Sequence, residues 1–362
     1  MQQVTQFNLN RLQRFRISFT LTIILLAFYS CQGPSSDSKD YTLGATSDSI
    51  PSTPTVEKDV EIVKSSLDTN TKALEKATPI SFSKSKAKGG FKFRYDLSNS
   101  DFTGTLHKEL TEISGLSYDI KSKTLLAIND EVGRLYRLDT QDFSLIDKKV
   151  FGELGDYEGI EMAKGIIYVL KSNGHIYPLN PKTLKAEDTF KTDLNSSNDV
   201  EGLAYDDSKD ELILACKGNP EVKDHKKLKD VKAFYRFEFD DEEIKKKPKF
   251  TISDDDLEDF TKDHYPDDIS KKEKKKLKSR AKDFSPSAIA KHPIDGHYYI
   301  LSSVGKLLVV CDNDGDIKII HFLDAKKFSQ PEGICFAPDG TMFISNEGRG
   351  IRGRASRFSY LK

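Results

Sequence analysis

From Phe91 onward, apolar and polar residues alternate in short runs that turn residues separate. Alternation with a period of two is typical of half-buried β-strands, and here it predicts an all-β domain. The runs come in groups of four, except that the last group has three. The expected strands are 113–118, 124–128, 135–138 and 145–150; 159–163, 166–170, 175–179 and 188–192; 202–205, 211–216, 233–239 and 249–252; 288–290, 297–301, 306–311 and 317–323; and 333–336, 342–345 and 356–360.

Each group begins with a copy of one short motif, whose fullest form is DYEGI at residues 156–160. Its central small residue lies at positions 115, 159, 202, 288 and 333. A repeat of forty-odd residues with four strands is typical of β-propeller blades. The chain is one strand short at its end, so we expect the isolated run Phe91–Tyr95 to complete the last blade and close the ring.

The double-length gap between positions 202 and 288 leaves two interpretations, a degenerate sixth blade or an insertion in the third. We prefer five blades, because both edge strands of blade three are accounted for around residues 254–284. This segment is acidic at Asp254–Asp259, and eight of the twelve residues from Lys271 to Lys282 are basic. Ser270 and Glu273 form a capping box that predicts a helix. Docking to an anionic lipid or polymer is possible, but a solvated helix compensated by the acidic run is preferred.

The N-terminus has the pattern of an export signal. Arg11, Arg14 and Arg16 precede an uncharged apolar run that ends at Tyr29, and Ser30-Cys31 follows. This pattern predicts a signal peptide over residues 1–31 with lipidation of Cys31; an ordinary cleaved signal or a retained anchor is the alternative. Residues 32–90 are rich in Ser, Thr, Asp, Lys and Pro, which predicts a disordered polar tether. The propeller domain is expected over residues 91–362, in the cell envelope on the extracytoplasmic side of a membrane.

Composition narrows the function classes. The formal net charge is −1 over 362 residues, which gives no general attraction to nucleic acid. The chain has no Trp, which argues against WD-type blades. Cys216, Cys311 and Cys335 lie in apolar runs, where free thiols act as small hydrophobes. We expect a monomer.

The motif predicts a ring of oxygen ligands. The first strand of a propeller blade lines the central channel, so equivalent positions at its start converge on one rim. The residues expected there are Glu158, Glu201 and Glu332, with Ser114 and Ser287 in the two blades whose motif lacks the acid. Unpaired carboxylates in a partly dry channel repel one another, and Ca²⁺, which takes six to eight oxygen ligands, would relieve that repulsion. The absence of His and Cys from the ring disfavours zinc. The alternative is a framework role, in which Gly permits a positive φ or a close approach and Glu caps a neighbouring backbone.

Polar residues that end the second strands are expected near the same rim. They are Asn129, Asp130, Glu131, Lys171, Lys217, Ser302, Ser303, Asn346 and Glu347. The two asparagines and the aspartate would complete a calcium shell. The two lysines would neutralise the glutamates or bind an anionic ligand, and the two glutamates of this set are spare acids.

The motifs together resemble the SdiA-regulated family of extracytoplasmic proteins. The matching phrases are ISGLSYD at 113–119, AINDE at 127–131, EGI at 158–160, VEGLAYD at 200–206, PSAI at 286–289 and PEGI at 331–334. The resemblance implies a five-bladed β-propeller that holds calcium, with a biochemical role that is not established. Lys171, Lys217 and the charged insertion depart from the family pattern.

Two function classes follow. The first is a lipid-anchored, calcium-stabilised propeller that binds a small ligand or a partner protein at its rim. The second is a calcium-dependent hydrolase of the lactonase, esterase or phytase kind, in which the metal polarises the substrate and Glu131 or Glu347 acts as general base. The binding module is preferred, because the sequence offers no evident second catalytic partner.

Overall fold

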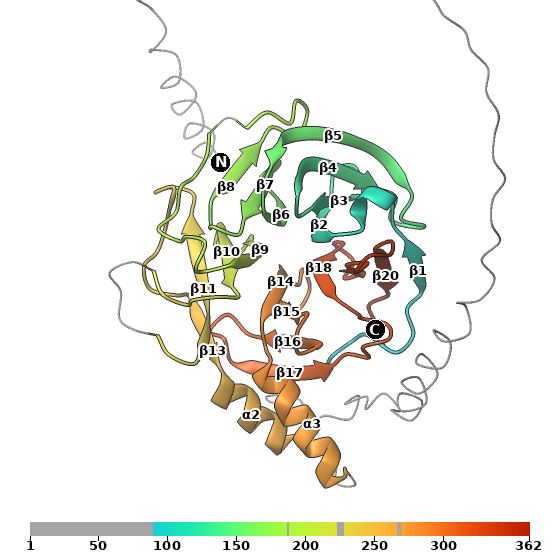
Figure 1. Cartoon of the computed structure of the whole chain (residues 1–362), viewed down its shortest axis with the longest axis vertical. Coiled ribbons are helices and arrows are strands. Elements are labelled where there is room, and N and C mark those ends of the chain that lie inside the picture. The colour runs from blue at the N-terminus through green and yellow to red at the C-terminus, as the bar shows by residue number, and fades with distance from the viewer. Residues whose placement is uncertain (1–89, 187, 223–227, 266–268) are drawn as a thin grey trace, which may run out of the picture. The chain divides into compact units, whose positions relative to one another are not determined.

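The computed structural model describes residues 90–186, 188–222, 228–265 and 269–362. These residues form five hydrogen-bonded β-sheets arranged in a ring, the five blades of a β-propeller (Figure 1). The preference for five blades over six is therefore confirmed. The predicted signal peptide and nearly all of the predicted tether lie outside the described residues.

The strands follow the chain from blade to blade. Blade one contains β2 (Ile113–Asp119), β3 (Thr124–Asn129), β4 (Val132–Leu138) and β5 (Leu145–Leu154); blade two contains β6 (Tyr157–Ala163), β7 (Ile166–Lys171) and β8 (Ile176–Leu179); blade three contains β9 (Val200–Asp206), β10 (Glu211–Cys216), β11 (Val231–Glu238), β12 (Glu243–Ile244) and β13 (Phe250–Ser253); blade four contains β14 (Pro286–Lys291), β15 (Tyr298–Ser302), β16 (Leu307–Cys311) and β17 (Ile317–Phe322); blade five contains β18 (Pro331–Phe336), β19 (Met342–Asn346), β20 (Arg354–Phe358) and β1 (Phe102–Thr105). A short 3-10 helix, η3 (Lys108–Leu110), joins β1 to β2. The first strand of each blade is its inner strand, and β2, β6, β9, β14 and β18 contact one another in turn around the ring.

An N-terminal strand closes the ring, as expected, but it is not the strand that the pattern suggested. β1 pairs antiparallel with β20, from Phe102 opposite Arg357 to Thr105 opposite Arg354. Residues 91–95 form no strand. Their alternating aromatic residues instead pack as rings against blades four and five: Phe93 lies 3.9 Å from the ring centroid of His321. The alternation therefore reflects ring packing rather than sheet pairing.

The prediction of a fourth strand in blade two, over residues 188–192, is also wrong. Only isolated bridges occur there, between Phe190 and Ile176 and between Ala186 and Leu179. Phe190 packs partly buried against the core, with its ring centroid 5.0 Å from that of Phe237. A single apolar residue among polar ones anchors the segment without specifying a regular strand.

The hydrophobic core is divided among the blade interfaces. Each of five buried clusters joins residues from two neighbouring blades, including the pair formed by blades five and one. The three cysteines Cys216, Cys311 and Cys335 are buried and free, as expected. Because the ring closes through β1, the interface between the last and first blades is packed like the others.

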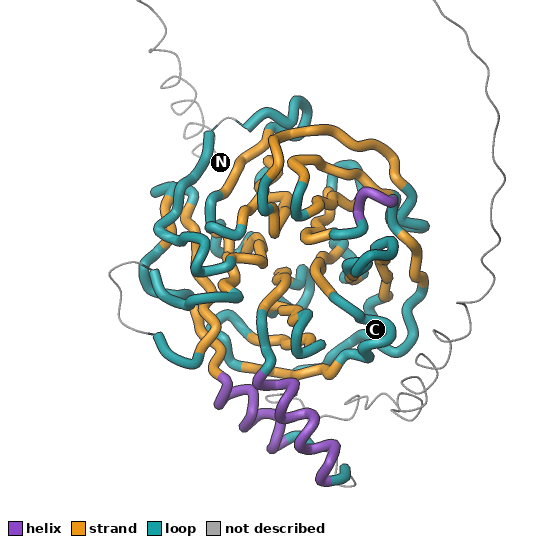
Figure 2. Tube along the Cα trace, in the orientation of Figure 1, coloured by secondary structure: helices purple, strands orange, loops and turns teal. Residues whose placement is uncertain are grey.

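The charged insertion forms two helices at the outer edge of the ring, α2 (Asp254–Asp263) and α3 (Lys271–Lys282) (Figure 2). α3 begins with the predicted Ser270–Glu273 capping box. α2 begins with a second box, in which Ser253 and Asp256 exchange hydrogen bonds. The charges of the acidic and basic runs compensate one another: Glu258 of α2 forms an ion pair with Lys278 of α3, with 2.6 Å between Oε1 and Nζ.

Candidate functional site: acidic cluster at the ring axis

Every predicted ring position is the extra residue of a β-bulge. In each blade the register between the inner and second strands skips one residue of the inner strand, as where Tyr157 pairs with Lys171 and Gly159 with Leu170. The five skipped residues are Ser114, Glu158, Glu201, Ser287 and Glu332. A bulge re-aims the side chain of its extra residue. The repeated motif thus directs one residue per blade away from the ladder, at the same end of each inner strand.

The glycine of the motif allows the inner strands to approach one another. A Cβ at Gly159 would lie 2.9 Å from the Cβ of Leu203 on the next inner strand, and one at Gly202 would lie 3.1 Å from the backbone nitrogen of Ile289. The first distance is shorter than real Cβ atoms show, and the second is tighter than most real Cβ contacts. Of the two framework roles proposed for this glycine, close approach is the one that the structure shows.

The pKa values of the three glutamates show that each pair with Glu201 interacts electrostatically. Burial raises the pKa of Glu158 to about 10, of Glu201 to about 7 and of Glu332 to about 8. The charge of Glu201 is the next largest cause of the increase for both Glu158 and Glu332. Acids that lie 43 and 131 residues apart in the sequence therefore act on one another across the ring, which supports the predicted convergence.

A second ring of side chains borders the first. It consists of the residue that follows the last paired position of each second strand: Asp130, Ser172, Lys217, Ser303 and Glu347. Four of them donate their backbone N–H to the residue two places before the bulge, as Lys217 does to the oxygen of Asp199 at 2.9 Å. Lys217 is the one cation among these five positions.

Lys217 forms an ion pair within the cluster. Its Nζ contacts Oε1 of Glu201, whose side chain is 9% exposed, and lies 4.0 Å from Oδ2 of Asp199. The pKa of Lys217 is raised by the charge of Glu201 against the opposing effect of burial. We refer to Glu158, Glu201, Glu332 and Lys217 as the axial cluster.

Lys171 does not share this position. It is the last paired residue of its strand, opposite Tyr157, so it stands one place before the second ring. Its Nζ lies over the rings of Tyr157, at 4.5 Å from the centroid, and Tyr177, at 5.3 Å. Because alternate residues of a strand face opposite sides, a shift of one place separates the two lysines.

The two serines of the first ring connect neighbouring blades. Ser114 Oγ donates to the backbone oxygen of Tyr157 at 2.6 Å, and Ser287 Oγ donates to that of Pro331 at 2.7 Å. Both side chains are buried. The hydroxyl protons are therefore used for the framework, and only the oxygen lone pairs remain for a ligand.

Asn129, Asp130 and Asn346, the three further ligands expected for calcium, differ in whether their side-chain oxygens already accept hydrogen bonds. Oδ1 of Asn129 accepts from the backbone N–H of Glu131 and of Val132, at 2.9 and 3.0 Å, so this amide caps a turn. Asp130 Oδ1 and Asn346 Oδ1 are buried and have no hydrogen-bond partner within the part of the chain that the structure describes. Burial, together with Glu112 and Glu131, raises the pKa of Asp130 to about 6.

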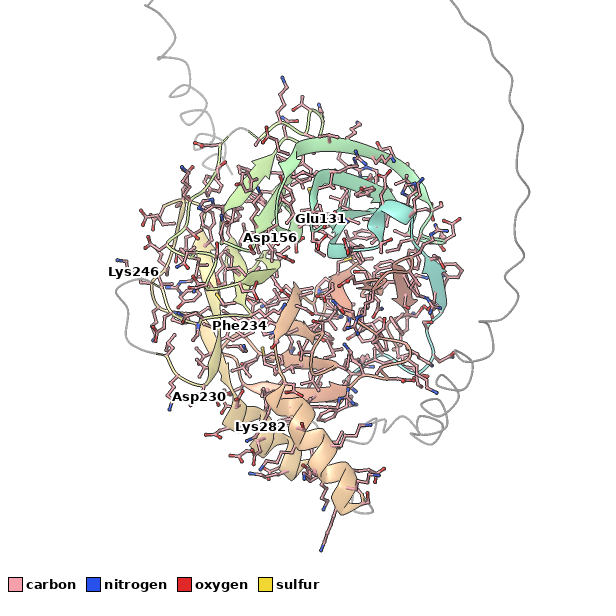
Figure 3. The ribbon with its side chains drawn as sticks, in the orientation of Figure 1. Glu131, Asp156, Asp230, Phe234, Lys246 and Lys282 are labelled. Atoms are coloured by element: carbon pink, nitrogen blue, oxygen red, sulfur yellow. The ribbon has the colours of Figure 1, made fainter. Side chains whose placement is uncertain are left out.

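The remaining acids lie around this cluster. Figure 3 places Glu131 and Asp156 toward the middle of the ring. Glu347 accepts a hydrogen bond from Gln330 Nε2, and burial raises its pKa. Asp156 Oδ2 accepts from the hydroxyl of Ser172.

Three of these neighbours were not singled out as site residues in the sequence. They are Asp156, Asp199 and Ser172. The signal was present, because an Asp stands two places before the glutamate in both DYEG and DVEG. Aligning the blades on the motif glycine would also have grouped the second ring.

The oxygen atoms that the structure describes around the ring axis are of the kind that a hard cation binds, but they are not arranged closely enough to coordinate one. The three glutamates offer carboxyl oxygens, and the neighbouring Asp130 and Asn346 each offer a buried, unpartnered oxygen, which is the ligand type that calcium prefers. Among the described residues, however, no three Asp, Glu, His or Cys side chains are close enough to hold one metal ion together. Calcium binding at this position would require the glutamate side chains to turn toward one another.

Comparisons with known proteins give a family and distant structural likenesses. No curated protein matches the chain. Among solved structures, glutaminyl cyclase of Myxococcus xanthus has 12% identity and a TM-score of 0.47, covering 73% of this chain and 97% of its own. A luciferin-regenerating enzyme has 10% identity and a TM-score of 0.44, covering 72% and 95%. The PQQ-bound aldose sugar dehydrogenase of Streptomyces coelicolor has 13% identity and a TM-score of 0.41, covering 71% and 98%.

The family comparison covers most of the propeller. The sequence model of the SdiA-regulated family matches residues 92–349, which include all five motif copies and both rings of side chains. The chain belongs to the SdiA-regulated family.

Proposed function

We propose that this protein is a calcium-binding propeller of the cell envelope that acts as a binding module for a small ligand or a partner protein. The observation that carries the proposal is the axial cluster, in which the three bulge glutamates have raised pKa values and the ammonium of Lys217 is paired with one of them, Glu201. Burial and mutual repulsion oppose the ionisation of these carboxyl groups, and a bound cation would favour their ionised form. The protein would act as a monomer, with no role for nucleic acid.

Calcium would be held by oxygen atoms of the two rings. Glu158, Glu201 and Glu332 would supply the charge, and the unpartnered oxygens of Asp130 and Asn346 would supply further ligands. A bound divalent cation would lower the free energy of the ionised glutamates and order the face of the ring that carries them.

In this proposal the protein would be held at a membrane by a lipid anchor at Cys31, which lies outside the described residues. Residues 91–95 pack at the ends of the blades opposite the bulges: Tyr95 Oη donates to Gly340 O at 2.5 Å, and Phe91 lies 4.8 Å from the ring of His297. The described chain thus begins on the face away from the axial cluster. Within the described residues, no helix is long and apolar enough to span a bilayer.

Calcium-dependent hydrolysis is the second candidate, and one observation favours it. Asp130 and Glu201 have pKa values of about 6 and 7 because of burial and neighbouring charge. Acids with pKa values near neutrality are suited to proton transfer at physiological pH. In this case Asp130, rather than the Glu131 or Glu347 expected from the sequence, would act as the general base, and it would then not be a ligand of the metal held by the glutamates.

Thermal unfolding with and without calcium tests the first proposal. In excess calcium the melting temperature of the full chain should exceed that in EGTA by about 5 °C, because a ligand that binds only the folded state stabilises it. Glu332→Gln should abolish most of this difference. Equal melting temperatures in saturating calcium and in EGTA would contradict calcium binding.

Turnover assays separate the second candidate from the first. Lactones, aryl esters and phosphomonoesters would each be offered to the full chain with calcium or with EGTA. Calcium-dependent turnover that Asp130→Asn removes, while calcium still raises the melting temperature of that variant, would establish the hydrolase. Stabilisation by calcium without any turnover would support the binding module.

A further inference from the structure

Lys217 is fixed in the axial cluster by its own backbone. Its N–H donates to the oxygen of Asp199 at 2.9 Å, and its carbonyl oxygen accepts from Lys232 Nζ at 2.5 Å. Both bonds hold the residue just beyond β10, where its side chain reaches Glu201. The backbone of Lys217 is thus fixed, and its ammonium is paired with Glu201 although the lysine side chain is 31% exposed.

Lys217 is the one positively charged residue among the ten positions of the two rings, which also contain five acidic residues. The first ring has three carboxylates and two serines, and the second has two carboxylates, two serines and Lys217. Asp156 and Asp199 add acids next to the bulges. The charge of Lys217 also acts on Glu332, across the ring from Glu201. One ammonium therefore serves at least two of the three glutamates.

Blade two shows what the same position does without a lysine. Ser172 occupies it, and its hydroxyl donates to Asp156, the residue that corresponds to Asp199. The hydrogen-bonding role of the position is therefore met by a serine. What Lys217 adds in blade three is a positive charge directed at the glutamates.

We propose that Lys217 is a built-in counter-ion of the axial cluster and that it competes with calcium for Glu201. A divalent cation that takes Glu201 as a ligand must displace the ammonium or share the carboxylate with it. Either event costs free energy, because like charges at short distance repel. Lys217 would thereby set the calcium affinity of this chain below that of a cluster without the lysine. The competition rests on the proposed calcium function, whereas the counter-ion role does not.

The counter-ion role is tested in chelator, by urea unfolding of the full chain with Lys217→Met, Glu201→Gln and the double variant. Lys217→Met alone leaves a buried carboxylate unpaired, which destabilises the folded state, and should raise the unfolding equilibrium constant about tenfold or more. With Glu201→Gln already present, the same substitution should have a much smaller effect. If the two effects simply add, the ion pair is not a coupled unit and the counter-ion role is wrong. If Lys217→Met does not fold, folding of the double variant would likewise show that the two residues are coupled.

The competition is tested by calorimetric titration of calcium into the full chain. Lys217→Met should bind calcium about tenfold more tightly than the unsubstituted chain, because the substitution removes a positive charge that repels a cation bound at Glu201. Lys217→Arg keeps the charge and should keep the weaker affinity. Lys171→Met is the matched control, because its ammonium lies over tyrosine rings, and it should leave the affinity unchanged.

The outcomes distinguish the two proposals. Equal affinity in Lys217→Met and the unsubstituted chain would overturn the competition while leaving calcium binding intact. Binding by Lys217→Met alone would establish the competition and show that the native chain uses the lysine in place of the metal. Binding by neither would overturn calcium as the ligand, and the unfolding experiment would still decide the counter-ion role.

Discussion

The central residue-scale feature is a β-bulge that recurs in every blade. An extra residue in an antiparallel ladder is left unpaired, so its side chain can be directed elsewhere. In blades two, three and five that residue is a glutamate, and the glycine after it lets the next blade approach. The two residues act together: the glutamate places the charge, and the glycine brings the charges of different blades close to one another.

Glu158 gives a prediction on pH dependence. Its folded-state pKa, about 10, lies above its ordinary value of 4.5. Below that ordinary value both states are protonated, so the group has no effect on stability. As the pH rises, the unfolded chain ionises first, and the free energy of unfolding falls until the folded pKa is passed. Glu158→Gln should therefore be more stable than the unsubstituted chain by up to about 5 kcal/mol at pH 8, with little difference near pH 4.

Urea unfolding in EGTA at a series of pH values measures this difference. Glu153→Gln, at an exposed position, serves as the control and should leave the pH profile unchanged. A Glu158→Gln profile parallel to that of the unsubstituted chain would show that the carboxyl is not held in a buried, repulsive setting.

At the scale of elements, the two-helix insertion is fastened to blade four. Arg280 of α3 donates to the backbone oxygens of Gly305 at 2.8 Å and Leu323 at 2.9 Å, and its guanidinium lies over Phe322 at 5.2 Å. Leu277 and Leu257 are buried beneath. The helices are thus anchored at their base, while the exposed lysines of α3 face solvent. This agrees with a solvated helical insertion and leaves lipid or polymer docking untested.

Removing the Arg280 side chain should loosen this attachment. Arg280→Ala leaves buried carbonyl groups without their donor, and we expect a loss of about 2–3 kcal/mol in the free energy of unfolding. Amide hydrogen exchange should also increase in α2 and α3 more than in the blades. Lys276→Ala, at an exposed position of the same helix, should change stability by less than ~0.5 kcal/mol. Equal effects of the two substitutions would argue against the anchor.

At the scale of the whole propeller, the chain closes its ring with β1 and reinforces it with residues 91–95. The backbone N–H of Leu361 donates to the oxygen of Arg94 at 2.8 Å, so both termini of the domain are joined beside β20. An open blade would expose an unpaired strand edge and the apolar face between blades five and one.

Truncation from the N-terminus tests this closure. Removal of residues 1–89 should shift the melting temperature by less than ~2 °C, whereas removal of residues 1–105 should lower it by more than ~10 °C or cause aggregation. Removal of residues 1–100, which spares β1 but not the aromatic segment, should have an intermediate effect. A stable monomer after removal of residues 1–105 would show that β1 is dispensable for closure.

Sequence alone determined the blades, the positions of the ring glutamates and the capping box of α3, because each depends on local periodicity or on a motif that repeats. Tertiary structure decided the rest. Phe102–Thr105 rather than Phe91–Tyr95 became the closing strand, because pairing with β20 is a contact between opposite ends of the chain. Lys217 rather than Lys171 reached the glutamates, because one position of register decides which side of a strand a residue faces. Sequence patterns specify which face of a strand is apolar and where turns occur, whereas the pairing of segments far apart in the sequence is decided only by tertiary packing.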